Sequence, residues 1–172
     1  YTKYLTQFAF CCKLPSNKCI PMRSLFLLFS FVLLTTCSGN SVDNPNCRFL
    51  LEGEVNLPIN LNLPEYSQLQ FDLQSVYVRN VGNGGIIVIN AVTSYLAWDA
   101  SDPNHTPNGC VLKASGVNAT CECSDKNTYS LINGQPLGHL LPNGDIEPDS
   151  GLLCSLKFYR VEQSGNNLLI SN

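Results

Sequence analysis

Residues 99–134 read DASDPNHTPNGCVLKASGVNATCECSDKNTYSLING, and this stretch decides how the rest of the chain is interpreted. It contains two polar, turn-rich loops, 102–110 and 121–127, and each loop carries cysteine. A short strand-like run, 111–120, joins the loops and turns at Gly116. Two cysteine loops held side by side either bind a metal ion or cluster, or form a disulfide with each other. The number and spacing of their thiol and imidazole side chains decide between these outcomes.

The flanking sequence has the pattern of β-strands. Apolar and polar residues alternate strictly from residue 55 to residue 63, which is typical of a strand with one buried face. Because Pro58 has no N–H group, we expect this strand at the edge of a sheet. The β-branched runs 73–79 and 86–90 flank a glycine-rich turn and predict a hairpin. No window of eleven or more residues beyond Cys37 has helical periodicity, so we predict an all-β domain.

The N-terminal part has the features of a secretory signal. Met22, the single methionine, is followed by Arg23 and by a run of about ten mostly apolar residues, 25–34. This run is too short to span a bilayer, which takes about 20 apolar residues. Its end, Leu34-Thr-Thr-Cys37, resembles the bacterial lipobox, whose cysteine becomes the lipidated first residue of the mature protein.

That resemblance implies a division of the chain. We expect an upstream extension foreign to the protein at 1–21, a lipoprotein signal peptide at 22–36, a tether at 37–47 and one β domain at 48–172. The lipid on Cys37 would anchor the protein to a membrane of the bacterial cell envelope, on the exported side. The redox or protein partner is unknown from sequence.

The charge of the mature part argues against nucleic acid as a partner. All 13 acidic residues follow Cys37, whereas four of the 10 basic residues precede it, so the part from Cys37 onward carries six basic residues and a net charge of −7. Nucleic-acid-binding proteins instead present clustered basic residues to the phosphates. We therefore expect no nucleic-acid binding.

Most of residues 60–172 resembles a Rieske-type iron–sulfur domain. The resemblance rests on five segments in order: Gly-Gly-Ile-Ile-Val-Ile (84–89), Tyr-Leu-Ala-Trp-Asp-Ala (95–100), Ala-Thr-Cys-Glu-Cys (119–123), Tyr-Ser-Leu-Ile-Asn-Gly-Gln (129–135) and Leu-Lys-Phe-Tyr-Arg-Val-Glu (156–162). It implies a sandwich of small antiparallel sheets with two adjacent cysteine loops.

The ligands that the resemblance would require are mostly missing. A Rieske [2Fe–2S] cluster takes two cysteines and two histidines, supplied as Cys-x-His and Cys-x-x-His. The first loop has Asp102-Pro-Asn104 at the expected place, with His105 displaced by one position, and the second has Cys121-Glu-Cys-Ser124. Only Cys121 matches. We therefore predict no cofactor and no metal, and keep as the alternative a ferredoxin-like electron carrier with a [2Fe–2S] cluster at these loop positions.

The same resemblance implies a disulfide between the loops. Some Rieske proteins carry an additional, bridged cysteine in each loop, and Cys110 and Cys123 resemble that pair. Pairing of Cys110 with Cys121 is an open alternative, and pairing of Cys47 with Cys154 is possible without support from their spacing. One of these five cysteines should stay free.

The loop residues also allow two other kinds of site. Cys110, Cys121, Cys123 and His105 could form a zinc site, but structural zinc sites usually use Cys-x(2–4)-Cys pairs and Cys121-x-Cys123 is tighter. His105, Asp102 and Cys110 form the one nearby set for nucleophilic catalysis, and the expected disulfide would consume the thiol. We therefore predict that the protein is not an enzyme, and that its domain has a structural or binding role.

Overall fold

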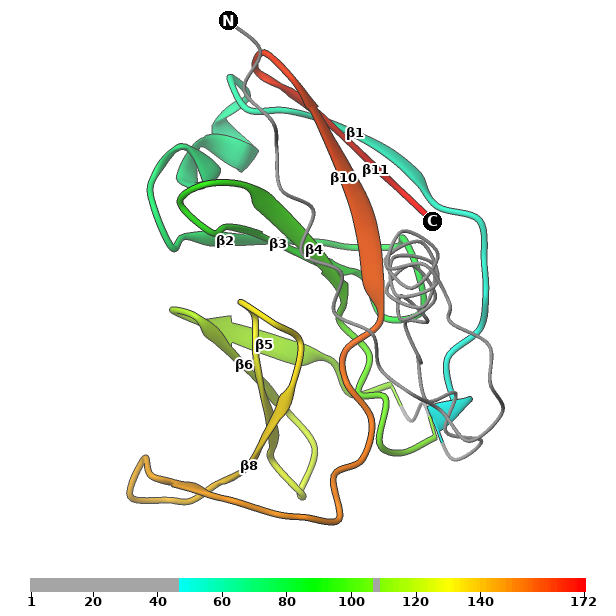
Figure 1. Ribbon diagram of the computed structural model, residues 1–172, viewed down its shortest axis with the longest axis vertical. Helices are drawn as coiled ribbons and strands as arrows, with labels where there is room; N and C mark the ends of the chain where they lie inside the picture. The colour runs from blue at the N-terminus through cyan, green and yellow to red at the C-terminus, as the bar shows by residue number, and fades with distance from the viewer. Residues whose placement is uncertain (1–46, 107–108) are drawn as a thin grey trace, which may run out of the picture. The chain divides into compact units, whose positions relative to one another are not determined.

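The computed structural model describes residues 47–106 and 109–172, and these residues form two antiparallel sheets (Figure 1). The predicted upstream extension, the signal peptide, Cys37 and nearly all of the tether lie outside the described residues. No helix within 47–106 or 109–172 combines the length and the hydropathy needed to span a bilayer. The predicted all-β class is confirmed for the described part of the chain.

The first sheet has six strands. Their order is β1 (Asn56–Asn60), β11 (Asn167–Ser171), β10 (Phe158–Ser164), β4 (Tyr95–Asp99), β3 (Ile86–Asn90) and β2 (Ser75–Val78). Strand β1 lies at an edge, as Pro58 predicts, and Pro58 is paired with Leu169 of β11. The predicted hairpin is also present, because β2 pairs with β3 along its whole length.

Strand β1 is shorter than the alternating pattern suggests. It ends at Asn60, whose side-chain oxygen accepts a hydrogen bond from the Asn62 N–H at 2.9 Å and so begins a turn. Leu63, the last residue of the pattern, is exposed. A seven-residue 3-10 helix, η2 (Pro64–Gln70), follows and buries Leu69; it is too short to give a helical period in the sequence.

Strand β3 is buried on both faces and separates two clusters of apolar side chains. Ile86 and Val88 pack with residues of β1, η2 and β11, whereas Ile87 and Ile89 pack toward the second sheet. Because side chains alternate along a strand, an unbroken apolar run such as Ile-Ile-Val-Ile indicates a strand covered on both sides.

The second sheet has five strands and is an insertion in the first. Its order is β5 (Leu112–Ser115), β6 (Asn118–Cys121), β7 (Asn127–Ser130), β8 (Pro136–Leu140) and β9 (Ile146–Glu147). The chain leaves the six-stranded sheet after β4 and returns at β10, where Phe158 is paired with Trp98. The ends of the insertion therefore lie beside each other.

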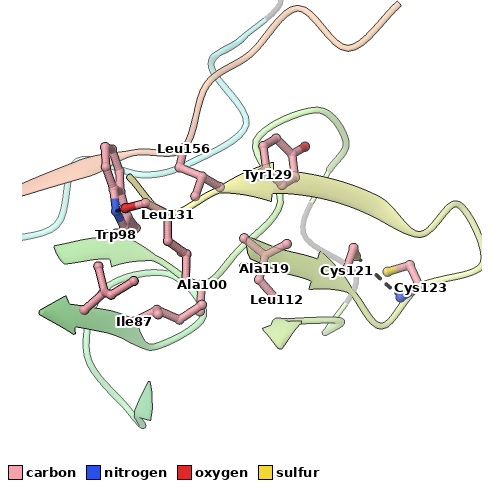
Figure 2. Packing of buried hydrophobic residues seen from close by; sticks show 11 residues of the cluster. Ile87, Trp98, Ala100, Leu112, Ala119, Cys121, Cys123, Tyr129, Leu131 and Leu156 are labelled. Atoms are coloured by element: carbon pink, nitrogen blue, oxygen red, sulfur yellow. Dashed lines mark hydrogen bonds between the residues drawn. The ribbon is translucent and has the colours of Figure 1, made fainter. Parts of the chain in front are cut away.

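A buried cluster joins the two sheets (Figure 2). Trp98 of β4 lies in this cluster, and its indole N–H donates to the Leu131 carbonyl beyond β7 at 2.8 Å. Gly134 makes room for the indole: a Cβ atom there would lie 2.5 Å from Trp98 Cζ3, and the φ of +72° is also unfavourable for other residues. The cluster fixes the base from which both cysteine loops project.

Candidate functional site

The two cysteine loops are covalently joined. The first connects β4 to β5 and the second connects β6 to β7, and a Cys110–Cys123 disulfide bridges them with Cα atoms 5.6 Å apart. This is the pair that the family resemblance implies, and the alternative Cys110–Cys121 pairing is absent from the structure. Cys47 and Cys154 form a second disulfide across 107 residues. Cys121 is the free cysteine among the described residues.

Asp102 is the buried centre of the first loop. One carboxylate oxygen, Oδ1, accepts hydrogen bonds from the Tyr129 hydroxyl at 2.5 Å and from the Asn104 N–H at 2.8 Å. The other, Oδ2, accepts from the Asn127 side-chain amide at 2.9 Å. The bond to Asn104 is an Asx turn, which sets the direction of the loop at Pro103. Asp102 is therefore held in a fixed position and its Oδ2 faces His105.

Asn104 positions the loop and is not available as a ligand. Its amide nitrogen donates to Tyr129 Oη and to the Cys154 carbonyl, both at 2.8 Å. Its side-chain oxygen accepts from the N–H groups of Leu153 at 3.0 Å and Cys154 at 2.9 Å. Asn104 therefore ties the first loop to the segment that carries the Cys47–Cys154 disulfide.

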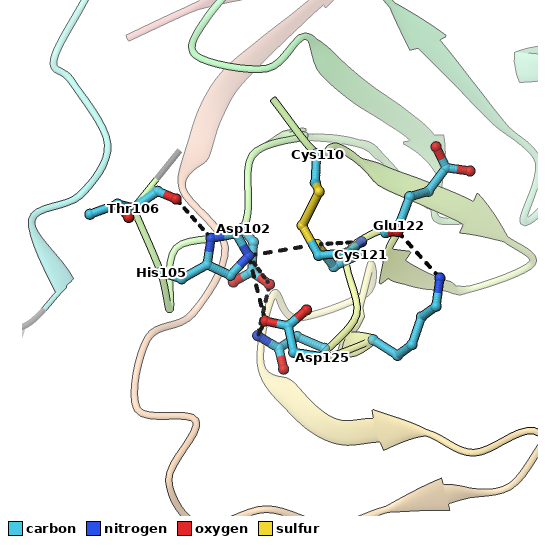
Figure 3. The surroundings of a disulfide bond; sticks show 10 residues. Asp102, His105, Thr106, Cys110, Cys121, Glu122 and Asp125 are labelled. Atoms are coloured by element: carbon cyan, nitrogen blue, oxygen red, sulfur yellow. Dashed lines mark hydrogen bonds and ion pairs between the residues drawn. A yellow bond between two sulfur atoms is a disulfide. The ribbon is translucent and has the colours of Figure 1, made fainter. Parts of the chain in front are cut away.

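His105 points one ring nitrogen into a group of acidic and thiol side chains (Figure 3). Its Nε2 lies 3.5 Å from Asp102 Oδ2, 3.6 Å from Asp125 Oδ2 and 3.7 Å from Cys121 Sγ. Its Nδ1 lies 2.9 Å from the Thr106 carbonyl oxygen. Because a carbonyl oxygen can only accept, Nδ1 carries the hydrogen, and in the neutral ring Nε2 presents its lone pair to the three side chains.

Cys121 is buried at the end of β6. Its sulfur accepts a hydrogen bond from the Cys123 N–H at 3.4 Å. The pKa of the thiol is raised to about 11, chiefly by burial; the hydrogen bond from the Cys123 N–H lowers the pKa, and the nearby carboxylates of Asp102 and Asp125 raise it. In the metal-free protein the Cys121 side chain is therefore a neutral thiol at physiological pH.

This pKa predicts slow alkylation of Cys121. At pH 8 we expect iodoacetamide to modify Cys121 roughly 100-fold more slowly in the native protein than in urea, because the thiolate reacts and the folded protein disfavours it. Peptide mass spectrometry without reductant measures the modification at this cysteine alone. Equal rates in the two conditions would contradict the buried, protonated thiol.

The geometry differs from that of a catalytic triad. In a triad the nucleophile contacts one ring nitrogen of the histidine and the orienting acid contacts the other. Here the Cys121 sulfur and the Asp102 carboxylate both face Nε2, while Nδ1 contacts the Thr106 carbonyl. The arrangement concentrates donor atoms at one point and does not relay a proton through the ring.

The structure brings together most of the loop residues considered from sequence. Asp102, His105 and Cys121 converge, and Asp125 joins them from the second loop. Ser124, where the resemblance would place the second imidazole, is an exposed turn residue and makes none of the contacts around His105. The hydrogen bonds from Asn127 and Tyr129 to Asp102 were not predicted from the sequence, because they join residues 25 and 27 positions apart and leave no local signal.

Comparison with solved structures gives a distant likeness. No family model matches the chain, and no curated protein matches it. Among solved structures, a chain of the complex of reduced oxygenase and oxidized ferredoxin in carbazole 1,9a-dioxygenase is 13% identical, with a TM-score of 0.45. The alignment covers 69% of this chain and 94% of that chain. Similarity at this level does not establish the family of this chain.

Proposed function

We propose that this chain is a lipid-anchored protein of the bacterial cell envelope, whose Rieske-like domain carries no [2Fe–2S] cluster and has a binding or structural role. The observation that carries the proposal is the set of donors at the loop tips, which holds one free thiol, Cys121, and one imidazole, His105; Cys110 and Cys123 are bridged to each other. Disulfides also suit an exported protein, since they persist in oxidising compartments.

The available donors do not fit a Rieske cluster. Such a cluster takes two thiolates on one iron and two imidazoles on the other. The site offers one free thiol, Cys121, and one imidazole, His105. The other histidine, His139, lies on β8 with its ring nitrogens 2.8 Å from the Asp125 carbonyl and 2.8 Å from Asp149 Oδ2. Two carboxylates complete the set around His105, so the ligand count is short by one thiolate and one imidazole.

The proposed function and the electron-transfer alternative predict opposite properties for the purified protein. The proposed function predicts a protein without a cluster. We expect protein prepared without air to be colourless, with no visible charge-transfer bands and neither iron nor acid-labile sulfide in stoichiometric amounts. The measurement is a visible spectrum together with iron and sulfide analysis. Two irons and two sulfides per chain, with the matching absorbance, would refute the proposed function.

The anchor is tested separately. We expect the wild-type protein in the membrane fraction, and the Cys37→Ala variant outside it, because one thioether-linked lipid is the proposed attachment. Ser41→Ala is a matched control, since it changes a small residue close to Cys37 and leaves the cysteine and both disulfides in place. Membrane association that survives Cys37→Ala would contradict the anchor and leave the cluster argument intact.

A further inference from the structure

We infer that His105, Cys121, Asp125 and Asp102 form a binding site for a single divalent transition-metal ion, best suited to zinc. The inference rests on the proposed function, because the loops must be free of an iron–sulfur cluster. It differs from the zinc set considered from sequence, since two of those cysteines, Cys110 and Cys123, are bridged to each other. It also departs from the prediction of no metal made from sequence.

The tautomer of His105 is the one that metal-binding histidines adopt. A ligating histidine commonly donates its second N–H to a backbone carbonyl, which fixes the ring and leaves the other nitrogen for the metal. Nδ1 of His105 makes this contact with the Thr106 carbonyl at 2.9 Å. The lone pair of Nε2 then faces a thiol and two carboxylates, an arrangement that a cation between them would stabilise.

The distances from His105 Nε2 to the other three donor atoms match tetrahedral zinc. Zinc lies about 2.05 Å from nitrogen, about 2.1 Å from oxygen and about 2.3 Å from sulfur, so tetrahedral angles give N···O separations of about 3.4 Å and N···S separations of about 3.6 Å. The separations from His105 Nε2 are 3.5 and 3.6 Å to oxygen and 3.7 Å to sulfur. These N···O separations exceed the 2.7–3.2 Å of direct hydrogen bonds.

Among the described residues, the two carboxylates have no permanently charged partner. Within 47–106 and 109–172, no lysine or arginine forms an ion pair with Asp102 or Asp125, and His105 is their one ion-pair partner. The second carboxylate oxygen of Asp125, Oδ1, is buried and has no hydrogen-bond partner among the described residues. A buried carboxylate oxygen without a donor is uncommon in a folded protein, and a cation held by both oxygens of Asp125 would account for it.

The composition of the donor set favours zinc over calcium or magnesium. One sulfur, one imidazole and carboxylate oxygens are ligands that zinc accepts together, whereas calcium and magnesium prefer oxygen alone. The side chains of His105 and Asp125 are 23% and 36% exposed, so an ion can reach the site from solvent. Bound zinc would connect the two loops a second time, beside the Cys110–Cys123 disulfide.

The test is zinc binding by the full chain after treatment with a chelator and without reductant. Isothermal titration with zinc should give one equivalent bound at this site, and cobalt should give a sulfur-to-cobalt charge-transfer band with four-coordinate d–d bands. His105→Ala and Cys121→Ser should each weaken zinc binding by about 100-fold or more, because even outer-shell changes cost 10- to 100-fold. The control Glu162→Gln, which removes an exposed carboxylate of β10, should bind as the wild type does.

Several results would overturn the inference. Zinc binding that survives both His105→Ala and Cys121→Ser belongs to other thiols of the chain, and a wild type that binds no zinc has no such site. Should Cys121→Ser fail to fold, Asp125→Asn replaces it, because that side chain is partly exposed and the change keeps its shape. A protein with two irons and two sulfides refutes the proposed function, whereas a protein with neither cluster nor zinc affinity refutes this inference alone.

Discussion

The double variant Cys47→Ser/Cys154→Ser is expected to lose about 4–5 kcal/mol of unfolding free energy. The disulfide joins residues 107 apart, so it encloses nearly the whole described domain. In the chain-entropy account, a covalent link across about 100 residues removes conformational freedom from the unfolded chain worth about 4.7 kcal/mol. Urea unfolding, followed by the fluorescence of Trp98, measures the change.

The Cys110–Cys123 disulfide is the matched control for the Cys47–Cys154 disulfide. Cys110 and Cys123 are 13 residues apart, and the same account gives about 3 kcal/mol for a loop of this length. We therefore expect Cys110→Ser/Cys123→Ser to unfold at a higher urea concentration than Cys47→Ser/Cys154→Ser. The reverse order would show that loop length does not govern the stabilisation in this domain.

Asp99→Ala is expected to lower the unfolding free energy by about 3–5 kcal/mol, because it leaves several buried donors without an acceptor. The carboxylate is fully buried at the end of β4. Its Oδ2 accepts from the Asn83 N–H at 2.8 Å, the Asn83 amide at 2.9 Å and the Tyr159 hydroxyl at 2.6 Å. Its Oδ1 accepts from the Ser101 N–H at 2.9 Å and the Gly84 N–H at 3.2 Å.

Tyr159→Phe provides the comparison for Asp99→Ala. It removes one of the five hydrogen bonds and keeps the aromatic ring in the core, so we expect a loss of about 1 kcal/mol in urea unfolding. Burial, together with the hydrogen bond to Asp99, raises the pKa of the Tyr159 hydroxyl, so the hydroxyl is a donor over the working pH range. A loss for Asp99→Ala no larger than that for Tyr159→Phe would contradict the network.

The strands were predictable because their signals are local. Alternation around Pro58, the run Ile86–Asn90 and the glycine-rich turn before it each depend on neighbouring residues, and the structure confirms the edge strand and the hairpin. The pairing of Cys47 with Cys154 joins segments 107 residues apart and depends on the tertiary fold. Spacing along the chain carries no information about such a pairing.

The convergence of side chains on His105 was not predictable in the same way. In the sequence, His105 lies one residue beyond the position at which a Rieske-type first loop would carry its histidine. The Asx turn at Asp102 brings the imidazole ring of His105 toward Cys121, which lies 16 residues after His105 in the chain. Asp125 reaches the same nitrogen because the disulfide and the Asn127 amide hold the second loop against the first.

The inserted five-stranded sheet has a consequence for how this protein can change over generations. Its two ends leave and re-enter the six-stranded sheet at paired strands, where the Asp99 N–H donates to the Lys157 carbonyl at 2.9 Å. Insertions or deletions confined to exposed turns of the inserted sheet, such as those at Gly116 and Gly144, therefore leave the pairing of β4 with β10 in place. Descendants of this chain can acquire new loop tips, and so new ligands, while inheriting the same supporting framework.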